Sequence, residues 1–370
     1  IIYNKDFKFL KNNEIKYLFI LYLYLIFNSL ISIDASVGLS RNLGFIRMII
    51  LFAAFNYFLN LKFFLRNILI VWSVLFFIIL IDIFLESFVG KNILGFGGEI
   101  YGDRIVSFFK DEPIVGGFVN GFYLIIIGFL FNEINNKNRD KILILFFSIL
   151  FLIAILLTGE RSNSIRAAIG LFIFYSIFKE YDFKKKLVYF TSIVILFLII
   201  IFNSDYLKSR YIGQIFSYFS NQPIYFKLYK SGFEVFKNYK LFGVGNKNYR
   251  VETCKYKESD QNKNKNYYCL THPHQIYFEI LSEHGLLGLI LIFYIFYKLI
   301  FSKVKETFKN DNYIKIASLI YLTLTFLPLL PSGAFFNDNM LTLFTINLSI
   351  FYGSCKNLNV FNQKKYNNIK

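Results

Sequence analysis

Long runs of apolar residues, separated by short charged connectors, extend along nearly the whole chain. A helix needs about 20 mostly apolar residues to cross about 30 Å of hydrocarbon. The runs are continuous rather than alternating, which favours helices over strands. They predict an all-α polytopic membrane protein with about ten or more transmembrane helices, at residues 17–33, 44–60, 68–89, 114–131, 142–157, 165–178, 187–202, 276–301, 314–330 and 340–352.

The composition supports this class of protein and excludes others. Of the 370 residues, 55% are hydrophobic, 21% are aromatic and 18% are charged, and the mean hydropathy is +0.47. An average soluble domain has about 25% charged residues, and one soluble core stops growing near about 250–300 residues. Disordered, collagen-like, coiled-coil and disulfide-dense secreted proteins are excluded by the same composition. Because the chain begins with Ile and holds two Met, we expect natural sequence to precede it.

The basic residues indicate which side of the membrane each connector faces. The chain has 41 Lys and Arg against 24 Asp and Glu, spread over many connectors rather than gathered in one patch, which argues against nucleic-acid binding. In membrane proteins Lys and Arg concentrate in cytoplasmic connectors. One set of connectors holds 21 of them, whereas the short connectors on the other side hold 7. We therefore expect both termini in the cytoplasm, together with the connectors at 61–67, 132–141, 179–186 and 302–315.

The long connector at 203–275 then faces outward as a large periplasmic loop, inserted into a single integral membrane domain of residues 1–370. Its 12 Lys and Arg do not oppose this, because long loops translocate largely regardless of charge. Cys254 and Cys269 both lie in this loop, where an oxidising compartment favours a disulfide over two free thiols. A zinc site is less favoured, because no C-x-x-C and no paired Cys/His spacing is present.

Ionisable residues near the predicted outer face are the best candidates for chemistry, because such groups are costly at a membrane. The first cluster is Thr158-Gly-Glu-Arg-Ser, with Arg166 one helical turn beyond Arg161. A guanidinium stays charged and offers a planar fork of donors for phosphate oxygens. Alternatively, Arg161 only reaches the interface or pairs with Glu160.

The second cluster contains all three His of the chain, within residues 272–284. His274, Glu279 and Glu283 are spaced so that they can share one edge of a helix. Imidazole titrates near neutrality and can take a proton from a sugar hydroxyl. The alternatives are polar caps on a helix that enters the bilayer, or a metal site made of His272, His274 and Glu279.

Two weaker clusters lie elsewhere on the same predicted face. Leu228, Phe233, Phe236 and Leu241 predict an amphipathic helix on the membrane, with lysines such as Lys227 at its interface. These cations could hold a lipid pyrophosphate, or they form a solvated basic face. A compact charged turn runs from Asp103-Arg104 to Lys110-Asp-Glu-Pro113 and is followed by Gly116-Gly117.

The stretch from His274 to Gly288 resembles the signature of the O-antigen ligase/polymerase family, H-[NSQ]-x-x-L-x-x-x-x-E-x-G-x-x-G. Phe278 stands where the family usually has Leu. The T-G-E-R-S stretch resembles the family's Arg motif, and the segment that ends in K-L-F-G-V-G-N-K-N-Y-R resembles the loop before its His, with Lys240 where Pro is common. The order R-x-x-S-x-x-x-D-E-x-x-x-G-G from Arg104 resembles an earlier outer-face motif. The resemblance covers about residues 95–350.

This resemblance implies an integral membrane glycosyltransferase with a GT-C-like helical fold. Such enzymes resemble inverting transferases that need no metal, nucleotide or other cofactor. They take a glycan from undecaprenyl pyrophosphate at the periplasmic face of the bacterial inner membrane and move it to a sugar hydroxyl. Carried onto this chain, His274 is the base, Glu283 orients it, and Arg161 binds the pyrophosphate. The second basic residue stays open among Arg104, Arg210, Arg250 and Lys227, because Tyr225 and Lys227 occupy the place of the family's second Arg.

Three functions remain open at this point. The first is a ligase that transfers the glycan to lipid A–core, and the second is a polymerase that joins lipid-linked repeat units. The third is a transporter of the lipid-linked sugar, which we would expect to show internal repeats and charges near the bilayer midplane. The sequence offers only Asp82 and Glu86 near one span, both toward its outer end.

Overall fold

The apolar runs form helices in a computed structural model of the chain, which describes residues 8–61, 63–97, 104–110, 112–133, 138–177, 182–213, 224–255, 266–309 and 312–362. All regular elements within these ranges are helical. They are η1 Lys8–Lys11, α1 Asn13–Leu30, α2 Ala35–Gly44, α3 Ile46–Leu59, α4 Phe64–Val89, η3 Ser107–Phe109, α5 Val115–Glu133, α6 Asn138–Leu157, α7 Arg161–Ser176, α8 Phe183–Phe202, α9 Asp205–Leu207, η4 Lys208–Gly213, α11 Ile224–Asn238, α12 Tyr249–Cys254, α13 Ile276–Leu299, η6 Phe301–Lys303, α14 Val304–Thr307, α15 Tyr313–Thr325 and α16 Asp338–Gly353.

Each of the ten predicted spans overlaps at least one helix of the structure. Among the described residues, five helical segments are long and apolar enough to cross a membrane, and a sixth is possible if a pair bent by 105° counts as one span. The five are Ala35–Leu59, Phe64–Val89, Val115–Glu133, Asp140–Leu157 and Ile276–Thr307, and the bent pair is Lys186–Phe202 with Asp205–Gly213. A polytopic membrane protein is therefore supported, while the number of ten spans and the GT-C-like arrangement stay predictions.

The exposed faces of these helices are apolar, as a hydrocarbon solvent requires. On α4, exposed positions include Val71, Val74 and Leu75, and on α8 they include Ile195 and Phe202. In water such continuous apolar faces would be an aggregation liability, whereas in a bilayer they contact lipid.

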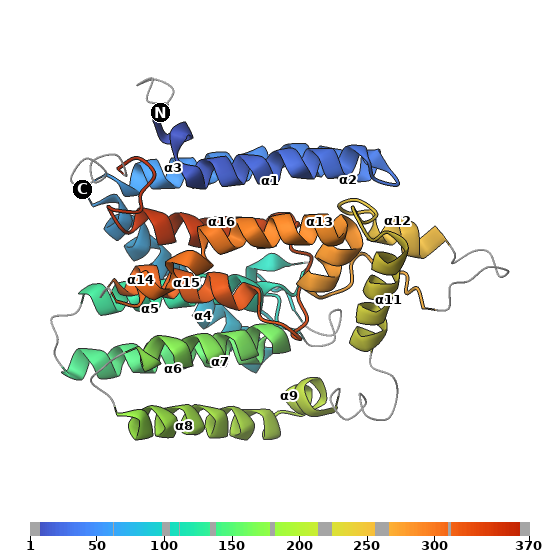
Figure 1. The fold of residues 1–370 in the computed structure, drawn as a ribbon. Coiled ribbons are helices and arrows are strands. Elements are labelled where there is room, and N and C mark those ends of the chain that lie inside the picture. The colour runs from blue at the N-terminus through green and yellow to red at the C-terminus, as the bar shows by residue number, and fades with distance from the viewer. Residues whose placement is uncertain are drawn as a thin grey trace. The chain divides into compact units, whose positions relative to one another are not determined.

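The chain divides into two compact units. The first unit comprises residues 1–60, 221–305 and 326–370, and the second comprises residues 61–220 and 306–325. In the first unit α1 packs against α2, α3 and α13, and α16 packs along α3 (Figure 1). Aromatic contacts fill this unit, such as Phe52 with Tyr352 at 5.6 Å between ring centroids and Phe296 with Phe344 at 5.3 Å.

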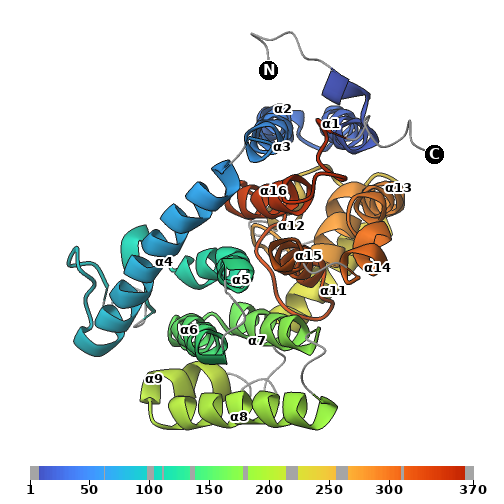
Figure 2. The same ribbon diagram turned by 90° about the vertical axis from the view of Figure 1, so that its left-hand side faces the viewer.

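In the second unit α5 is the central helix, surrounded by α4, α6, α7 and α15 (Figure 2). A β-carbon added at Gly128 of α5 would lie 2.6 Å from the carbonyl oxygen of Tyr313, so this glycine allows the start of α15 to approach closely. The buried Tyr123 hydroxyl donates to the carbonyl of Ala167 and joins α5 to α7. Small residues and side-chain hydrogen bonds replace the hydrophobic driving force that is missing between helices in lipid.

The helix α13 is broken at Gly285, whose backbone angles are φ 65° and ψ −165°. The break frees backbone groups on both sides of it, and the segment 240–245 pairs with them. The amides of Val244 and Gly245 donate to the carbonyls of Ser282 and Glu283 at 2.9 Å each. On the other side of the break, the amides of Leu286 and Leu287 donate to the carbonyls of Lys240 and Leu241 at 2.8 and 3.1 Å. The Gly243-Val-Gly245 segment and the part of α13 around Gly285 therefore form one hydrogen-bonded structure, here called the α13 break.

This pairing explains why the 240–245 segment contains two glycines. A β-carbon at Gly243 (φ 69°) would lie 2.3 Å from the Glu283 carbonyl carbon, and one at Gly245 (φ 99°) would lie 2.0 Å from the Ser32 β-carbon. Both positions lie in the left-handed region that glycine tolerates best. At both positions, the close contact and the left-handed backbone conformation each require glycine.

We predict that Gly243→Ala destabilises the protein far more than Gly333→Ala. The first substitution places a methyl group against backbone that cannot move aside, which should lower the free energy of unfolding by at least about 2 kcal/mol. The second meets only the Met340 γ-carbon at 3.8 Å. Thermal unfolding of the two variants in detergent measures this, and similar midpoints would contradict the role given to Gly243.

Candidate functional site

The His loop, residues 271–275, stands immediately before α13 in the first unit. Gln275 caps the helix, because its side-chain oxygen accepts from the amides of Tyr277 at 2.7 Å and Phe278 at 3.1 Å. The His274 carbonyl accepts from the Ser332 amide at 2.9 Å, and the ring centroids of His272 and His274 lie 4.0 Å apart. Both imidazoles are thus presented together at the start of one helix.

Both of these histidines are held in their neutral form. Burial, followed by the neighbouring His274 and Lys247, lowers the pKa of His272 to about 3. Burial also lowers the pKa of His274 below its ordinary value, against a hydrogen bond with the Ser332 backbone that raises it. A neutral imidazole keeps a free lone pair, so each ring is in the form that a general base needs, and its lowered pKa makes it a weak base.

The helix α11 covers the His loop from one side. The Tyr225 ring stands nearly perpendicular to His274, with centroids 6.0 Å apart, and Tyr229 stacks on Phe278 at 5.3 Å. A β-carbon at Gly232 would lie 3.1 Å from the Pro273 side chain, so glycine permits this close packing.

The buried face of α11 differs in part from the predicted one. Leu228 is buried as expected, with Ser231, Gly232 and Val235. Phe233 is 43% exposed, and the helix ends at Asn238, so that the 60% exposed Leu241 belongs to the 240–245 segment instead. The predicted amphipathic helix is therefore present with its buried side against protein, while its placement on the membrane stays a prediction.

Three ionisable side chains of α13 are fully buried beside the α13 break: Glu279, Glu283 and His284. Both Glu279 oxygens accept from the Phe335 amide, at 3.1 and 3.0 Å. The amides of Lys247 and Tyr249 act on the Glu283 carboxyl group, although neither of its oxygens completes a hydrogen bond to any residue that the structure describes. In the described ranges no hydrogen bond joins Glu283 to His274, so the orienting role of Glu283 stays a hypothesis.

Lys247 is the residue that sequence reasoning missed. Its ammonium acts electrostatically on His272, Glu279, Glu283 and His284, and its backbone is left-handed with φ 65°. This conformation costs a non-glycine residue about 1–2 kcal/mol of free energy. The available signal was a lysine between Asn246 and Asn248 directly after the G-V-G element, but a turn with basic residues is ordinarily a solvated loop.

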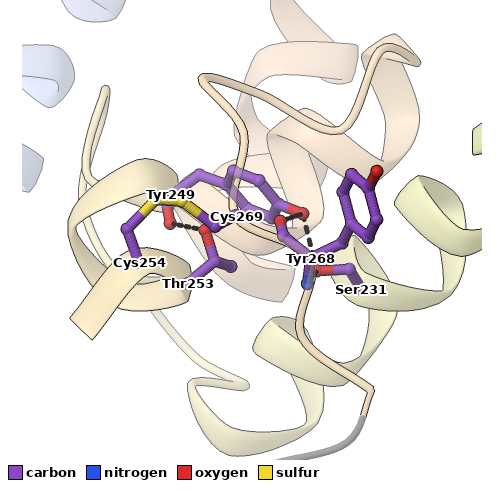
Figure 3. The surroundings of a disulfide bond; sticks show 6 residues. All are labelled: Ser231, Tyr249, Thr253, Cys254, Tyr268 and Cys269. Carbon is purple, nitrogen blue, oxygen red and sulfur yellow. Dashed lines mark hydrogen bonds between the residues drawn. A yellow bond between two sulfur atoms is a disulfide. The ribbon is translucent and has the colours of Figure 1, made fainter. Parts of the chain in front are cut away.

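The disulfide between Cys254 and Cys269 ties the end of α12 to the segment before the His loop (Figure 3). Next to it the Tyr249 hydroxyl lies 2.6 Å from the Ser231 hydroxyl of α11 and donates to the Tyr268 carbonyl at 3.3 Å. The Tyr268 amide donates to Ser231 at 2.9 Å. These bonds hold α11, α12 and the His loop as one body.

In the second unit the two remaining motifs meet. Glu160, which precedes α7, accepts from the amides of Gly116 at 2.8 Å and Gly117 at 3.0 Å in the first turn of α5. Asn163 donates to the same carboxylate at 2.7 Å. Burial raises the pKa of Glu160, while Asn163, then Arg104, and the two amides oppose this rise. Glu160 is therefore an acceptor at a helix N-terminus, which complements the helix dipole.

Three of the candidate arginines gather around this motif. Arg104 acts on Glu160 and donates to the Pro113 carbonyl at 3.0 Å, while Arg210 donates to the Gly159 carbonyl at 3.4 Å. Arg161 is the half-buried first residue of α7. By contrast, Lys227 on α11 and Arg250 on α12 are exposed side chains of the first unit.

The metal alternative was His272, His274 and Glu279. Among the residues that the structure describes, no group of three or more His, Cys, Asp or Glu is arranged to hold a metal ion. Glu279 instead uses both oxygens to accept from the Phe335 amide. The geometry therefore gives this ligand set no support.

A comparison with known protein families finds a match in part of the chain. The model of the O-antigen ligase family matches residues 146–293, a range that contains the Arg161 motif, the 240–245 segment and the His274 signature. The match supports an O-antigen ligase family assignment for this chain. No curated protein matches it.

The neutral histidines make stability depend on pH. An unfolded His titrates near 6.5, whereas folded His272 has a pKa of about 3, so between these values the unfolded chain binds a proton that the folded chain does not. Stability should therefore fall as pH decreases below about 6.5. We predict that His272→Asn reduces the drop in unfolding midpoint between pH 7.5 and 5.0, and equal drops in both proteins would contradict the buried neutral state.

Proposed function

From the O-antigen ligase family assignment, we propose that the protein is a membrane glycosyltransferase that moves a glycan from undecaprenyl pyrophosphate to a sugar hydroxyl of lipid A–core. The observation that carries this proposal is the neutral His272–His274 pair at the start of α13, inside the range that matches the family. Such a pair can accept the proton that a hydroxyl loses when it becomes a nucleophile. The charge distribution of the connectors supports a periplasmic site in the bacterial inner membrane, with both termini cytoplasmic.

The proposed reaction is a single inverting displacement. His274 takes the proton from the acceptor hydroxyl while the hydroxyl oxygen attacks the anomeric carbon. The new carbon–oxygen bond forms as the bond to pyrophosphate breaks, and the electron pair leaves with the pyrophosphate oxygen. Pyrophosphate is a good leaving group, so we propose that the transfer requires no divalent cation, which EDTA treatment tests. Glu283 is proposed to support the loop that carries the base.

Arg161 is proposed as the main pyrophosphate ligand, helped by Arg104 and Arg210. Support comes from their gathering around one motif of the second unit. Guanidinium groups bind phosphate oxygens in bidentate fashion. The exposed Arg250 and Lys227 are weaker candidates for this role.

A polymerase that joins lipid-linked repeat units is the second candidate, because it uses the same donor and the same base. A transporter is less supported. Asp82 and Glu86, the charges that could have indicated one, are used by the protein itself: Glu86 accepts from the amides of Val106 and Ser107 at 2.9 and 2.7 Å, and Asp82 accepts from the Ser107 hydroxyl at 2.5 Å. These contacts hold the backbone at residues 106–107 in place, which is a structural role and not that of a transport pathway.

The acceptor separates the two enzymatic candidates. Purified protein is given undecaprenyl-pyrophosphate-linked oligosaccharide with and without lipid A–core, and products are resolved by gel and mass spectrometry. Product on lipid A–core alone supports the ligase, while longer lipid-linked chains without that acceptor support the polymerase. No transfer in either reaction, with donor binding intact, would contradict both.

We predict that His274→Ala lowers turnover by at least about 100-fold, because general base catalysis typically contributes 10²–10⁴-fold. Binding of the lipid-linked donor should stay within a few-fold of wild type, since the imidazole acts on the acceptor. Transfer rates and donor affinity are measured on protein that elutes as a single species. Turnover near the wild-type rate would remove His274 from the role of base.

We predict that Arg161→Lys also loses most of the activity, since an ammonium cannot replace a bidentate guanidinium fork. Arg47→Ala is the matched control, because Arg47 is an exposed guanidinium paired with Asp338 at 3.1 Å on the first unit. The control should keep the wild-type rate. An Arg161→Lys protein as active as the control would show that no bidentate contact is needed there.

A further inference from the structure

Lys247 is held in place by its two asparagine neighbours. The Asn246 amide donates to the Asn28 side-chain oxygen at 2.8 Å, and the Asn248 side chain donates to the Asp34 carbonyl at 3.1 Å and accepts from the Asp34 amide at 2.9 Å. Both asparagines are fully buried. The turn is thus fixed to α1 and to the start of α2 before any ligand binds, so positioning Lys247 requires little further ordering.

The backbone at Lys247 has φ 65°, which L side chains rarely adopt and glycine adopts freely. A strained residue of this kind points to a function for its side chain. The turn itself does not need a side chain there, because its hydrogen bonds come from the flanking asparagines.

The surroundings of the Lys247 ammonium are rich in ionisable groups but offer it no close partner. The side chain is half-buried and acts on the His loop and on the buried α13 carboxyls. Of the ion pairs and hydrogen bonds formed by the described residues, none uses this ammonium. Glu279 has both of its oxygens at the Phe335 amide. Lys247 therefore brings positive charge to the His loop, where it acts on the neutral His272.

We infer that Lys247 binds a phosphate group of the lipid-linked donor beside His274, which deepens the proposed function and rests on it. As the carbon–oxygen bond to pyrophosphate breaks, negative charge grows on the departing oxygen. The fixed ammonium stabilises that charge and stays protonated throughout, while the acceptor proton goes to His274. The chemical class recognised is a polyprenyl-linked pyrophosphate.

Lys247→Gly is the informative variant, because it removes the ammonium and at the same time relieves the strained backbone. It should fold at least as stably as wild type. Lys247→Arg keeps the charge, and Lys91→Ala is the matched control, an exposed lysine in the connector after α4. Binding is measured for undecaprenyl pyrophosphate without glycan and for undecaprenol, so that the result does not depend on transfer.

We predict that Lys247→Gly weakens binding of undecaprenyl pyrophosphate about tenfold or more, as expected for loss of a charged hydrogen bond. Binding of undecaprenol should not change, and Lys247→Arg and Lys91→Ala should stay within about threefold of wild type. Unchanged pyrophosphate binding by Lys247→Gly overturns the inference but not the proposed function. Failure of the wild-type protein to bind undecaprenyl pyrophosphate overturns both.

A second comparison tests whether Lys247 serves only to balance the charge of Glu283. If it does, adding Glu283→Gln to Lys247→Gly removes the unbalanced carboxylate and restores pyrophosphate binding, which overturns the inference. If Lys247 contacts phosphate, the double variant binds as weakly as Lys247→Gly. Should the glycine variant fail to fold, Lys247→Gln carries the same comparison.

Discussion

The broken helix α13 is the constraint on which the first unit depends. A membrane span must pair every backbone amide and carbonyl within the protein, because hydrocarbon offers no partner. The break at Gly285 violates the continuous helix, and the 240–245 segment repairs it with four backbone hydrogen bonds. The residues that follow this segment are thereby placed beside α13, so that Lys247 and Tyr249 meet Glu283. The hydrogen bonds that pair the broken backbone of α13 therefore also position the residues of the candidate site.

Buried asparagines extend this hydrogen-bonded structure into α1 and α2. Asn28 donates to the Phe242 carbonyl at 3.0 Å and accepts from the Asn246 amide at 2.8 Å, while Asn42 donates to the Leu25 carbonyl at 2.9 Å. An amide side chain can serve a donor and an acceptor at once, which irregular backbone in a buried place requires. Removing one such partner leaves a buried polar group unsatisfied, and this costs about 1–3 kcal/mol. The network therefore selects one register of the 240–245 segment against α13.

The sequence predicted the positions of the helices far better than it predicted which segments contact one another. Long apolar runs give helices because burial and hydrogen bonding are local along the chain, and the predicted run 187–202 lies within α8. The break in α13 was not predicted, because Gly285 lies inside the predicted span 276–301 and the segment that pairs with the break lies about 40 residues earlier in the chain. The prediction identified His274 from composition and resemblance, yet it missed Lys247, whose importance comes from a left-handed turn. Likewise, the sequence did not indicate that the Glu160 carboxylate accepts from the amides of Gly116 and Gly117 in α5 and from the Asn163 side chain.

Burial lowers the pKa of His274 below its ordinary value, and this has a consequence for the proposed reaction. A base that binds protons weakly is present in its neutral form, but it has little driving force to remove a proton from a hydroxyl. A pyrophosphate bound at Lys247 would add negative charge next to the His loop and cancel the positive field that Lys247 exerts on His272. Opposite charge favours an imidazolium, so donor binding would make His274 a stronger base only when a donor is present. An acceptor hydroxyl that binds before the donor would meet a weak base. The donor would then have to bind first for reaction, because of electrostatics and without any conformational change.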